Sequence, residues 1–124
     1  MSATNLTLVI FCTLEFEALH CWASIPDDSP SQFLKYPHRH LFKITVYSEV
    51  SHTDRDLEFI HLKHRVQKFL KEEFTDFSVD SDIPFIKSMS CEDLALHLLE
   101  KLNLNKVKVS EDGENGAIVF KSSK

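Results

Sequence analysis

Two stretches of alternating apolar and polar residues constrain the fold of this chain more than any other feature. They span residues 4–20 and 38–50. Successive side chains of a strand point to opposite faces, so each stretch predicts a long strand with one apolar face. In the first strand that face carries Leu6, Leu8, Ile10, Cys12, Leu14, Phe16, Ala18 and His20. In the second it carries His38, His40, Phe42, Ile44 and Val46.

Three histidines lie on these apolar faces, namely His20, His38 and His40. If the two strands pair antiparallel, the three imidazoles converge at one end of the sheet. Three histidine ligands with an open fourth position are typical of a catalytic zinc site. The spacing does not exclude iron, nickel or copper. The alternative is that His38 and His40 simply begin a strand and that His20 is hydrogen-bonded elsewhere.

The rest of the chain predicts an α+β protein. Pro26, Pro30 and Pro37 mark residues 22–37 as a loop. Apolar residues then recur at helical spacing from Leu57 to Phe74 and again after Ser90, which is a predicted helix N-cap. Residues 51–56 and 75–89 are predicted to be irregular, and strands are predicted over 106–111 and 117–121, joined by a turn over 112–116. The predicted order is ββααββ in one domain, residues 1–124, with the helices covering one face of an antiparallel sheet.

Composition limits the classes of function. The net charge of the 124 residues is −5, and no block of basic residues is present, which argues against nucleic acid as a partner. The sequence has no secretion signal and no apolar run long enough for a membrane span, so no membrane partner is expected. The three cysteines form no regular pattern. We therefore expect a cytoplasmic protein from a reducing compartment.

Three further residues have a chemical and a structural interpretation. Glu111 is predicted to end a strand on the face of Val107 and Val109, where its carboxylate could accept two N–H bonds from a pterin or guanine edge. The alternative is an ordinary glutamate before a turn. Cys91, in the first turn of a helix, is expected to be a small core residue. Cys21 follows His20 and is expected to point to the opposite face of the strand.

Five segments resemble a known family. They are Phe16-Glu17-Ala18-Leu19-His20, His38-Arg39-His40, Glu58-Phe59-Ile60-His61-Leu62-Lys63, Ser90-Cys91-Glu92-Asp93-Leu94-Ala95, and Val107-Lys108-Val109-Ser110-Glu111 followed by Gly116. They are similar, in this order, to the Phe-x-Ala-Ala-His, His-Gly-His, Asp-Phe-x-x-Leu-Lys, Thr-Ser-Glu and Val-x-Glu-Thr segments of 6-pyruvoyltetrahydropterin synthase and 6-carboxytetrahydropterin synthase. The resemblance extends from about residue 14 to residue 120.

This resemblance implies a tunnelling fold (T-fold), in which the sheets of several ββααββ subunits join into a barrel, commonly as a homohexamer. It implies one zinc per subunit, held by His20, His38 and His40, and a pterin substrate bound by Glu111, Cys91 and Glu92. The implied reaction is that of a zinc-dependent lyase acting on dihydroneopterin triphosphate. Zinc polarises the hydroxyl-bearing side chain of the substrate so that a general base can take a carbon-bound proton.

The sequence departs from the family at the groups that transfer protons. Leu34 stands where the family has its catalytic cysteine, Asp76-Phe77 where it has an Asp-His pair, and Arg39 where it has the central glycine of His-Gly-His. Asp76 is the expected catalytic residue, and the wider set of candidate bases is Cys21, Asp76, Asp80 and Asp82. The expected function is a pterin lyase with altered proton-transfer residues. The first alternative is a non-catalytic or differently reacting relative that binds zinc and a pterin or guanine-like ligand. The second is a purely structural oligomer whose histidines bind adventitious metal.

Overall fold

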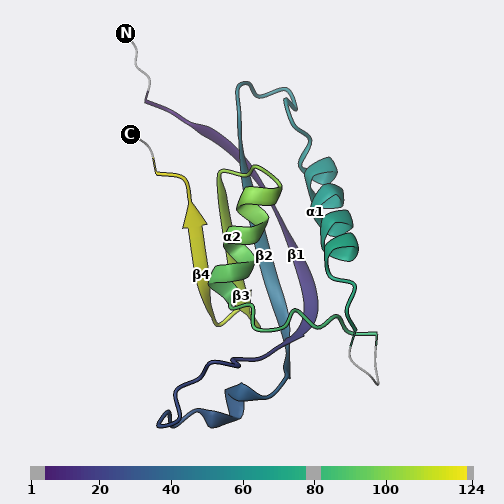
Figure 1. The fold of residues 1–124 in the computed structure, drawn as a ribbon. Coiled ribbons are helices and arrows are strands. Elements are labelled where there is room, and N and C mark those ends of the chain that lie inside the picture. Colours follow the sequence, from purple (N-terminus) through teal and green to yellow (C-terminus); the bar gives the residue numbers. More distant parts are fainter. Residues whose placement is uncertain (1–4, 78–81, 123–124) are drawn as a thin grey trace.

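The structure is a computed structural model that describes residues 5–77 and 82–122. Within these residues the elements follow the order ββααββ (Figure 1), which confirms the α+β class predicted from the sequence. The strands are β1 (Leu8–His20), β2 (His38–Val50), β3 (Lys106–Glu111) and β4 (Asn115–Phe120), and the helices are α1 (Phe59–Glu73) and α2 (Cys91–Lys101).

The strands form one antiparallel sheet in the order β1-β2-β3-β4. β1 and β2 pair along 13 residues, which places His20 opposite His38. On the β2 side, β3 contacts only the middle of that strand, and the last residue of β3, Glu111, lies opposite Phe42. The end of the β1–β2 hairpin that carries the histidines therefore borders the turn between β3 and β4.

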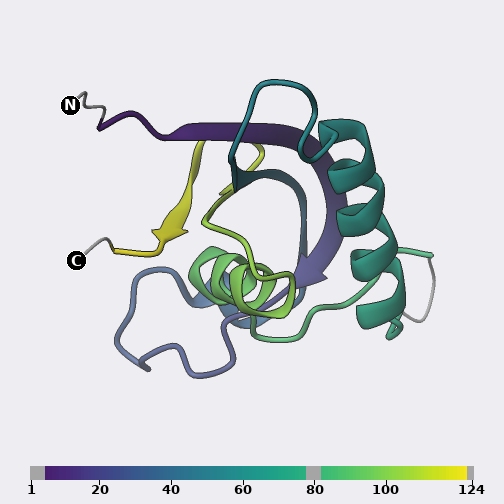
Figure 2. The same ribbon diagram turned by 90° about the horizontal axis from the view of Figure 1, so that it is seen from above.

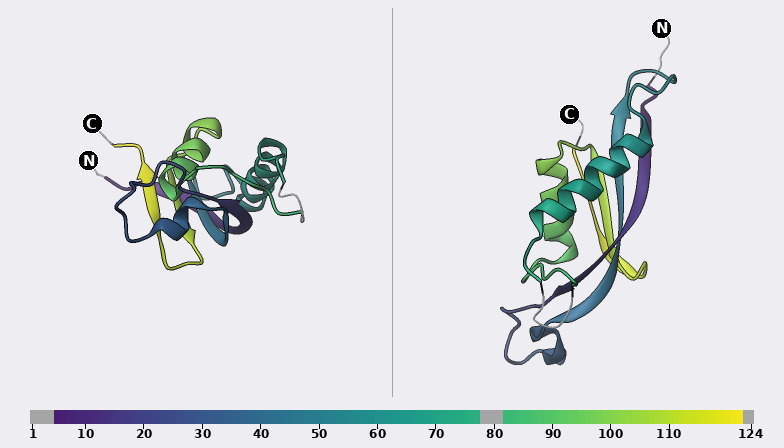
Figure 3. Two further views of the ribbon diagram at one scale, coloured as in Figure 1. Left: turned by 60° about the horizontal axis from the view of Figure 1, so that its bottom comes forward. Right: turned by 90° about the vertical axis from the view of Figure 1, so that its right-hand side faces the viewer.

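Both helices cover the same face of the sheet (Figure 3), and β1 curves around the core toward α1 (Figure 2). α1 buries Leu62, Val66 and Leu70 at helical spacing, as the sequence pattern predicts. α2 buries Cys91, Leu94, Ala95, Leu98 and Leu99. These residues pack in one cluster with the fully buried strand residues Phe42, Ile44, Val46, Val107 and Val109. The alternation of the strands thus selects the face that the helices cover.

The boundaries of some elements differ from the prediction. β1 begins at Leu8, whereas the predicted start, residue 4, lies outside the described residues. Leu6 was predicted on the covered face of the strand, but it precedes β1 and is 91% exposed. β4 begins at Asn115, two residues earlier than predicted, because Asp112 and Gly113 adopt positive φ angles of 57° and 79° and reverse the chain within three residues. The loop over 22–37 contains a short 3₁₀ helix at Gln32–Lys35 that the sequence did not predict.

The segment before α2 fixes the end of β1. Leu19 donates its N–H to the Pro84 carbonyl and accepts a hydrogen bond from the Ile86 N–H, at 2.9 and 2.8 Å. Cys21 likewise donates its N–H to the Lys87 carbonyl at 2.9 Å. This part of the predicted irregular stretch is therefore ordered by backbone hydrogen bonds. Across residues 5–77 and 82–122, neither helix has the length and apolar character needed to cross a membrane.

The outer strands of the sheet, β1 and β4, each have one edge without a partner strand among the described residues, apart from the contact at Leu19. The face of the sheet opposite the helices carries exposed Phe11, Ile118 and Phe120. An open edge and an exposed apolar face are features that proteins usually cover by association or shield with charge.

Candidate metal centre

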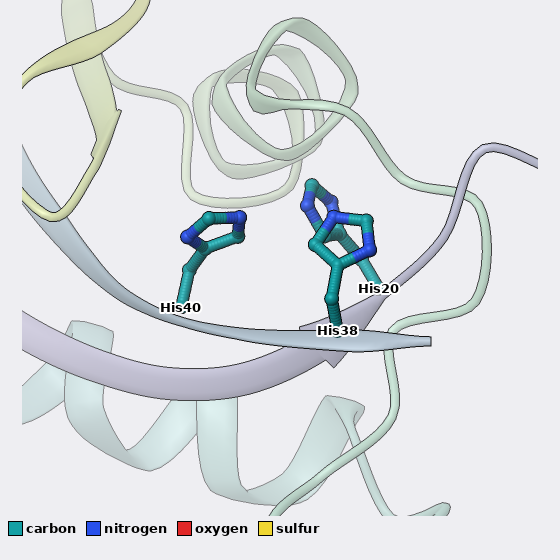
Figure 4. A group of neighbouring side chains, drawn as sticks. All are labelled: His20, His38 and His40. Atoms are coloured by element: carbon teal, nitrogen blue, oxygen red, sulfur yellow. The ribbon is translucent and has the colours of Figure 1, made fainter. Parts of the chain in front are cut away.

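The antiparallel register brings the three predicted histidines together. His20 is the last residue of β1, and His38 and His40 are the first and third residues of β2. Their ring centroids are separated by 4.6 Å (His20–His38), 5.3 Å (His20–His40) and 5.1 Å (His38–His40). Figure 4 shows the rings on one side of the strands, and one potential ligand atom from each lies within 4.8 Å of the others. The predicted convergence is confirmed, and the group could hold a metal ion.

One nitrogen of each imidazole is hydrogen-bonded to an oxygen. The Nδ1 atom of His20 lies 2.8 Å from the Met89 carbonyl, and that of His38 lies 2.8 Å from the Tyr36 carbonyl. The Nδ1 atom of His40 lies 2.7 Å from Asp112 Oδ2. Because carbonyl and carboxylate oxygens only accept hydrogen bonds, each Nδ1 is a donor, and Nε2 is the nitrogen left to face a metal.

The Nε2 atom of His20 is buried and makes no hydrogen bond. Oε2 of Glu111 lies 3.0 Å from it, and Oε1 of Glu111 lies 3.7 Å from Nε2 of His40. The short contact at His20 is therefore a close approach without hydrogen-bond geometry. A buried polar atom without a partner is costly, and a bound cation would supply the partner that is missing here.

Burial and neighbouring charges set the protonation states around the histidines. Burial lowers the pKa of His20, which favours the neutral imidazole that binds metals. The hydrogen bond from His40 lowers the pKa of Asp112, with a second contribution from the Leu41 N–H. The pKa of Cys91 is raised to about 12, mainly by burial and further by the nearby carboxylates of Glu111 and Glu92. Cys91 therefore stays a neutral thiol, as expected for a small core residue.

A cavity of about 530 Å³ opens beside the histidines, and His20, His38 and Glu111 form part of its wall. This volume lies within the range of about 300–1,000 Å³ that is usual for small-molecule sites. The N-terminal turn of α2 supplies another part of the wall through Cys91 and Glu92. The capping box of Ser90 and Asp93 fixes this turn, since each side chain accepts from the backbone N–H of the other. The structure thus brings two of the predicted metal-binding residues, His20 and His38, and the predicted substrate-binding residues to one cavity.

The residues at the family's proton-transfer positions are divided between two places. Leu34, which stands at the cysteine position, lines the cavity beside the histidines. Asp76 does not line this cavity and instead lies 3.7 Å from the ammonium group of Lys87. Phe77 lines a different cavity, between β1 and α1. Asp80 lies outside the described residues. Within one chain, the expected catalytic Asp76 is therefore separate from the histidine group.

Sequence reasoning missed one residue of the site, Asp112, and placed another, Cys21, on the wrong face. Asp112 was assigned only to a turn, yet its carboxylate binds both His40 and the backbone N–H of Leu41. The pairing of Glu111 with Phe42 places Asp112 beside Leu41 and His40, and no pattern in the sequence sets this register. Cys21 was expected on the opposite face, but the chain leaves the sheet after His20, and Cys21 lines the same cavity with Sγ 3.7 Å from Ser88 Oγ.

The donor set fits a transition metal. Three imidazoles, each fixed through Nδ1 by an oxygen, are a usual arrangement around zinc, and the buried Nε2 of His20, which makes no hydrogen bond, could coordinate the metal. The remaining four histidines lie elsewhere: His52 is exposed in the connection before α1, His61 and His64 are exposed on α1, and His97 is bound to Glu73 at 2.6 Å.

Comparison with known proteins supports the fold. No family model and no curated protein sequence matches this chain. A crystal structure described as that of the uncharacterized protein WS1659 from Wolinella succinogenes is similar, with a TM-score of 0.71 and 17% sequence identity. The alignment covers 95% of this chain and 100% of that one. At this level of identity the likeness shows that the two chains share a fold over nearly their whole length.

Proposed function

We propose that this chain is a member of the 6-pyruvoyltetrahydropterin and 6-carboxytetrahydropterin synthase family and binds one zinc ion through His20, His38 and His40. The proposed activity is that of a lyase acting on dihydroneopterin triphosphate. The observation that carries the proposal is the convergence of three imidazoles, with each Nδ1 bound to an oxygen, next to a cavity of about 530 Å³ that His20 and His38 line. Zinc is the metal that best suits three neutral imidazoles and an open position.

The cavity offers complementary groups for the rest of the substrate. The Glu111 carboxylate lies on its wall and can accept two N–H bonds from the amino-pyrimidinone edge of a pterin. Glu92 contributes a second carboxylate at the start of α2. A zinc ion at the histidines would polarise a hydroxyl of the substrate side chain and lower the barrier to loss of the adjacent carbon-bound proton.

A base must accept that proton. Among the candidates named from the sequence, Cys21 lines the cavity in this chain, whereas Asp76 does not line it and lies beside Lys87. Elimination of triphosphate or cleavage of the side chain would then follow proton removal.

A second candidate function is binding of a pterin or guanine without turnover. Leu34 favours it, because an apolar side chain that cannot accept a proton lines the cavity at the family's cysteine position.

The metal assignment is tested by elemental analysis of the purified protein. Wild-type protein should contain one zinc per chain, and the His38→Ala/His40→Ala variant should contain none. The His61→Ala/His64→Ala variant is a matched control, since it removes two exposed histidines from α1 and should keep the metal. Stoichiometric zinc in the His38→Ala/His40→Ala variant would contradict the site.

The reaction is tested by product analysis after incubation with dihydroneopterin triphosphate, together with calorimetric titration of neopterin and sepiapterin. Turnover supports the lyase, and tight binding without turnover supports the second candidate. If turnover occurs, its loss in Cys21→Ala or in Asp76→Asn identifies the base. If no pterin binds or reacts, the proposed ligand class is wrong.

We also propose that the working unit is a homo-oligomer, with a hexamer as the expected state. The open edges of β1 and β4 and the exposed Phe11, Ile118 and Phe120 support association through the sheet. Light scattering measures the mass directly. A stable monomer at micromolar concentration would contradict the barrel and would leave Asp76 without access to the histidines.

A further inference from the structure

The contact between Glu111 and His20 brings a carboxylate oxygen close to a buried ring nitrogen. His20 uses its Nδ1–H to bind the Met89 carbonyl, so Nε2 is the nitrogen that faces Glu111. Oε2 of Glu111 lies 3.0 Å from Nε2, and this nitrogen forms no hydrogen bond. A cation held by both atoms would satisfy them together.

The spacing of these atoms is that of neighbouring ligands on one metal ion. With zinc–ligand bonds of about 2.0–2.1 Å, two ligand atoms at a tetrahedral centre are separated by about 3.3 Å. Oε2 of Glu111 lies 3.0 Å from Nε2 of His20, and Oε1 lies 3.7 Å from Nε2 of His40, on either side of that value. The carboxylate therefore lies beside two of the three histidines, within reach of a metal ion that they would hold.

The backbone holds Glu111 in this position. The residue ends β3 opposite Phe42, whose ring packs edge-on against His20 with centroids 5.2 Å apart. Immediately after it, Asp112 donates its N–H to the Leu41 carbonyl at 2.8 Å. The Glu111 carbonyl also accepts the N–H of Glu114 at 3.0 Å, which closes the turn. The same hairpin thus carries Glu111 toward two histidines and Asp112 toward one of them.

We propose that Glu111 is the fourth ligand of the metal in the substrate-free protein, which makes the site three histidines and one carboxylate. This inference rests on the metal site of the proposed function and assigns that site a resting state. The thiol that the resemblance places near the metal does not compete for the position, because Leu34 stands there. The assignment concerns the substrate-free state, so it leaves Glu111 free to bind a pterin once a substrate occupies the metal.

The test compares metal binding in wild-type protein and in three variants that each remove one carboxylate charge. Glu111→Gln removes the proposed ligand and keeps its shape. Glu92→Gln removes a charge from the same cavity, and Glu114→Gln removes one from the same turn. Loss of a residue that only supports a ligand weakens metal binding by about 10–100-fold, so loss of a ligand should exceed about 100-fold. Competition with a chelator measures the zinc affinity, and both control variants should stay close to wild type.

Cobalt(II) in place of zinc reports the coordination directly. The wild-type protein should give the intense visible bands of a four-coordinate ion, and addition of azide should leave them unchanged because no position is open. In Glu111→Gln the bands should weaken, and azide should shift them. If this variant does not fold, as judged by circular dichroism, the azide titration of the wild-type protein decides the question.

The outcomes separate this inference from the proposed function. Wild-type affinity and an unchanged cobalt spectrum in Glu111→Gln would overturn the fourth ligand while leaving the three-histidine site intact. A cobalt spectrum of the wild-type protein that shifts on addition of azide would also overturn it. Wild-type protein that binds neither zinc nor cobalt would instead overturn the metal site itself, and the fourth ligand with it.

Discussion

The covered face of the sheet differs between its middle and the end where β1 finishes. In the middle, Ile44 pairs with Val109 and Val46 with Val107, and all four side chains are fully buried beneath the helices. At the end, His20 lies opposite His38 and forms one wall of a cavity. The same alternation therefore produces an apolar core in one region and a group of imidazoles in the other.

The difference lies in what covers each region. The middle is covered by helix side chains, which offer apolar contacts and no hydrogen bonds. The end is bordered by backbone near Tyr36 and Met89, whose carbonyls bind the histidines, and by the carboxylates of Glu111 and Asp112. A buried apolar side chain needs only close packing, whereas a buried imidazole needs a partner at both nitrogens. This contrast predicts that stability and metal binding respond to different substitutions.

The largest expected effect is on the core. Leu62→Ala on α1 should lower the free energy of unfolding by about 2–5 kcal/mol, because Leu62 is fully buried and its removal leaves a cavity. Urea denaturation of the metal-free protein measures this change. Leu62→Met, which nearly conserves volume, should cost less than about 1.5 kcal/mol. The zinc affinity of the folded Leu62→Ala protein should match wild type, and a tenfold loss would mean that the two regions are coupled.

A smaller effect is expected at the carboxylate that supports a histidine. Asp112→Asn should weaken zinc binding by about 10–100-fold, or about 1.4–2.7 kcal/mol, because a neutral amide polarises the His40 ring less than a carboxylate does. Asparagine also tolerates the positive φ of this position, 57°, so the turn should be preserved. Chelator competition gives the affinity, with unfolding in urea as the control for stability. Zinc binding as tight as wild type would show that this hydrogen bond does not influence the metal.

The smallest expected effect is the response of the metal-free protein to pH. Burial lowers the pKa of His20 below its usual value of 6.5, so the unfolded chain binds this proton more readily than the folded chain does. The stability contributed by His20 is therefore present above pH 6.5 and is lost as the pH falls from 6.5 toward the folded pKa. Thermal unfolding with a chelator present, followed between pH 7.5 and pH 5.5, measures the loss. His20→Gln should flatten the profile in this range, and a profile as steep as wild type would assign the effect to other groups.

The strands, the helices and the face that each of them buries follow from the sequence alone, because side-chain periodicity depends on local backbone geometry. The alternation over 8–20 and 38–50 is sufficient to place His20, His38 and His40 on one face, and the capping box at Ser90 marks the start of α2. The prediction was weakest at the chain reversals. Leu6 lies beyond the paired part of β1, and the positive φ angles of Asp112 and Gly113 shorten the last turn.

The tertiary structure alone decided which groups complete the site. Asp112 reaches His40 from 72 residues away, and the Met89 carbonyl reaches His20 from 69 residues away. Glu111 lies within 3.0 Å of His20 Nε2, and Cys21 turns into the cavity because the chain leaves the sheet after His20. These contacts depend on strand register and on where the backbone turns. Such features are set by packing between distant segments, whereas side-chain periodicity reports only on the segment that carries it.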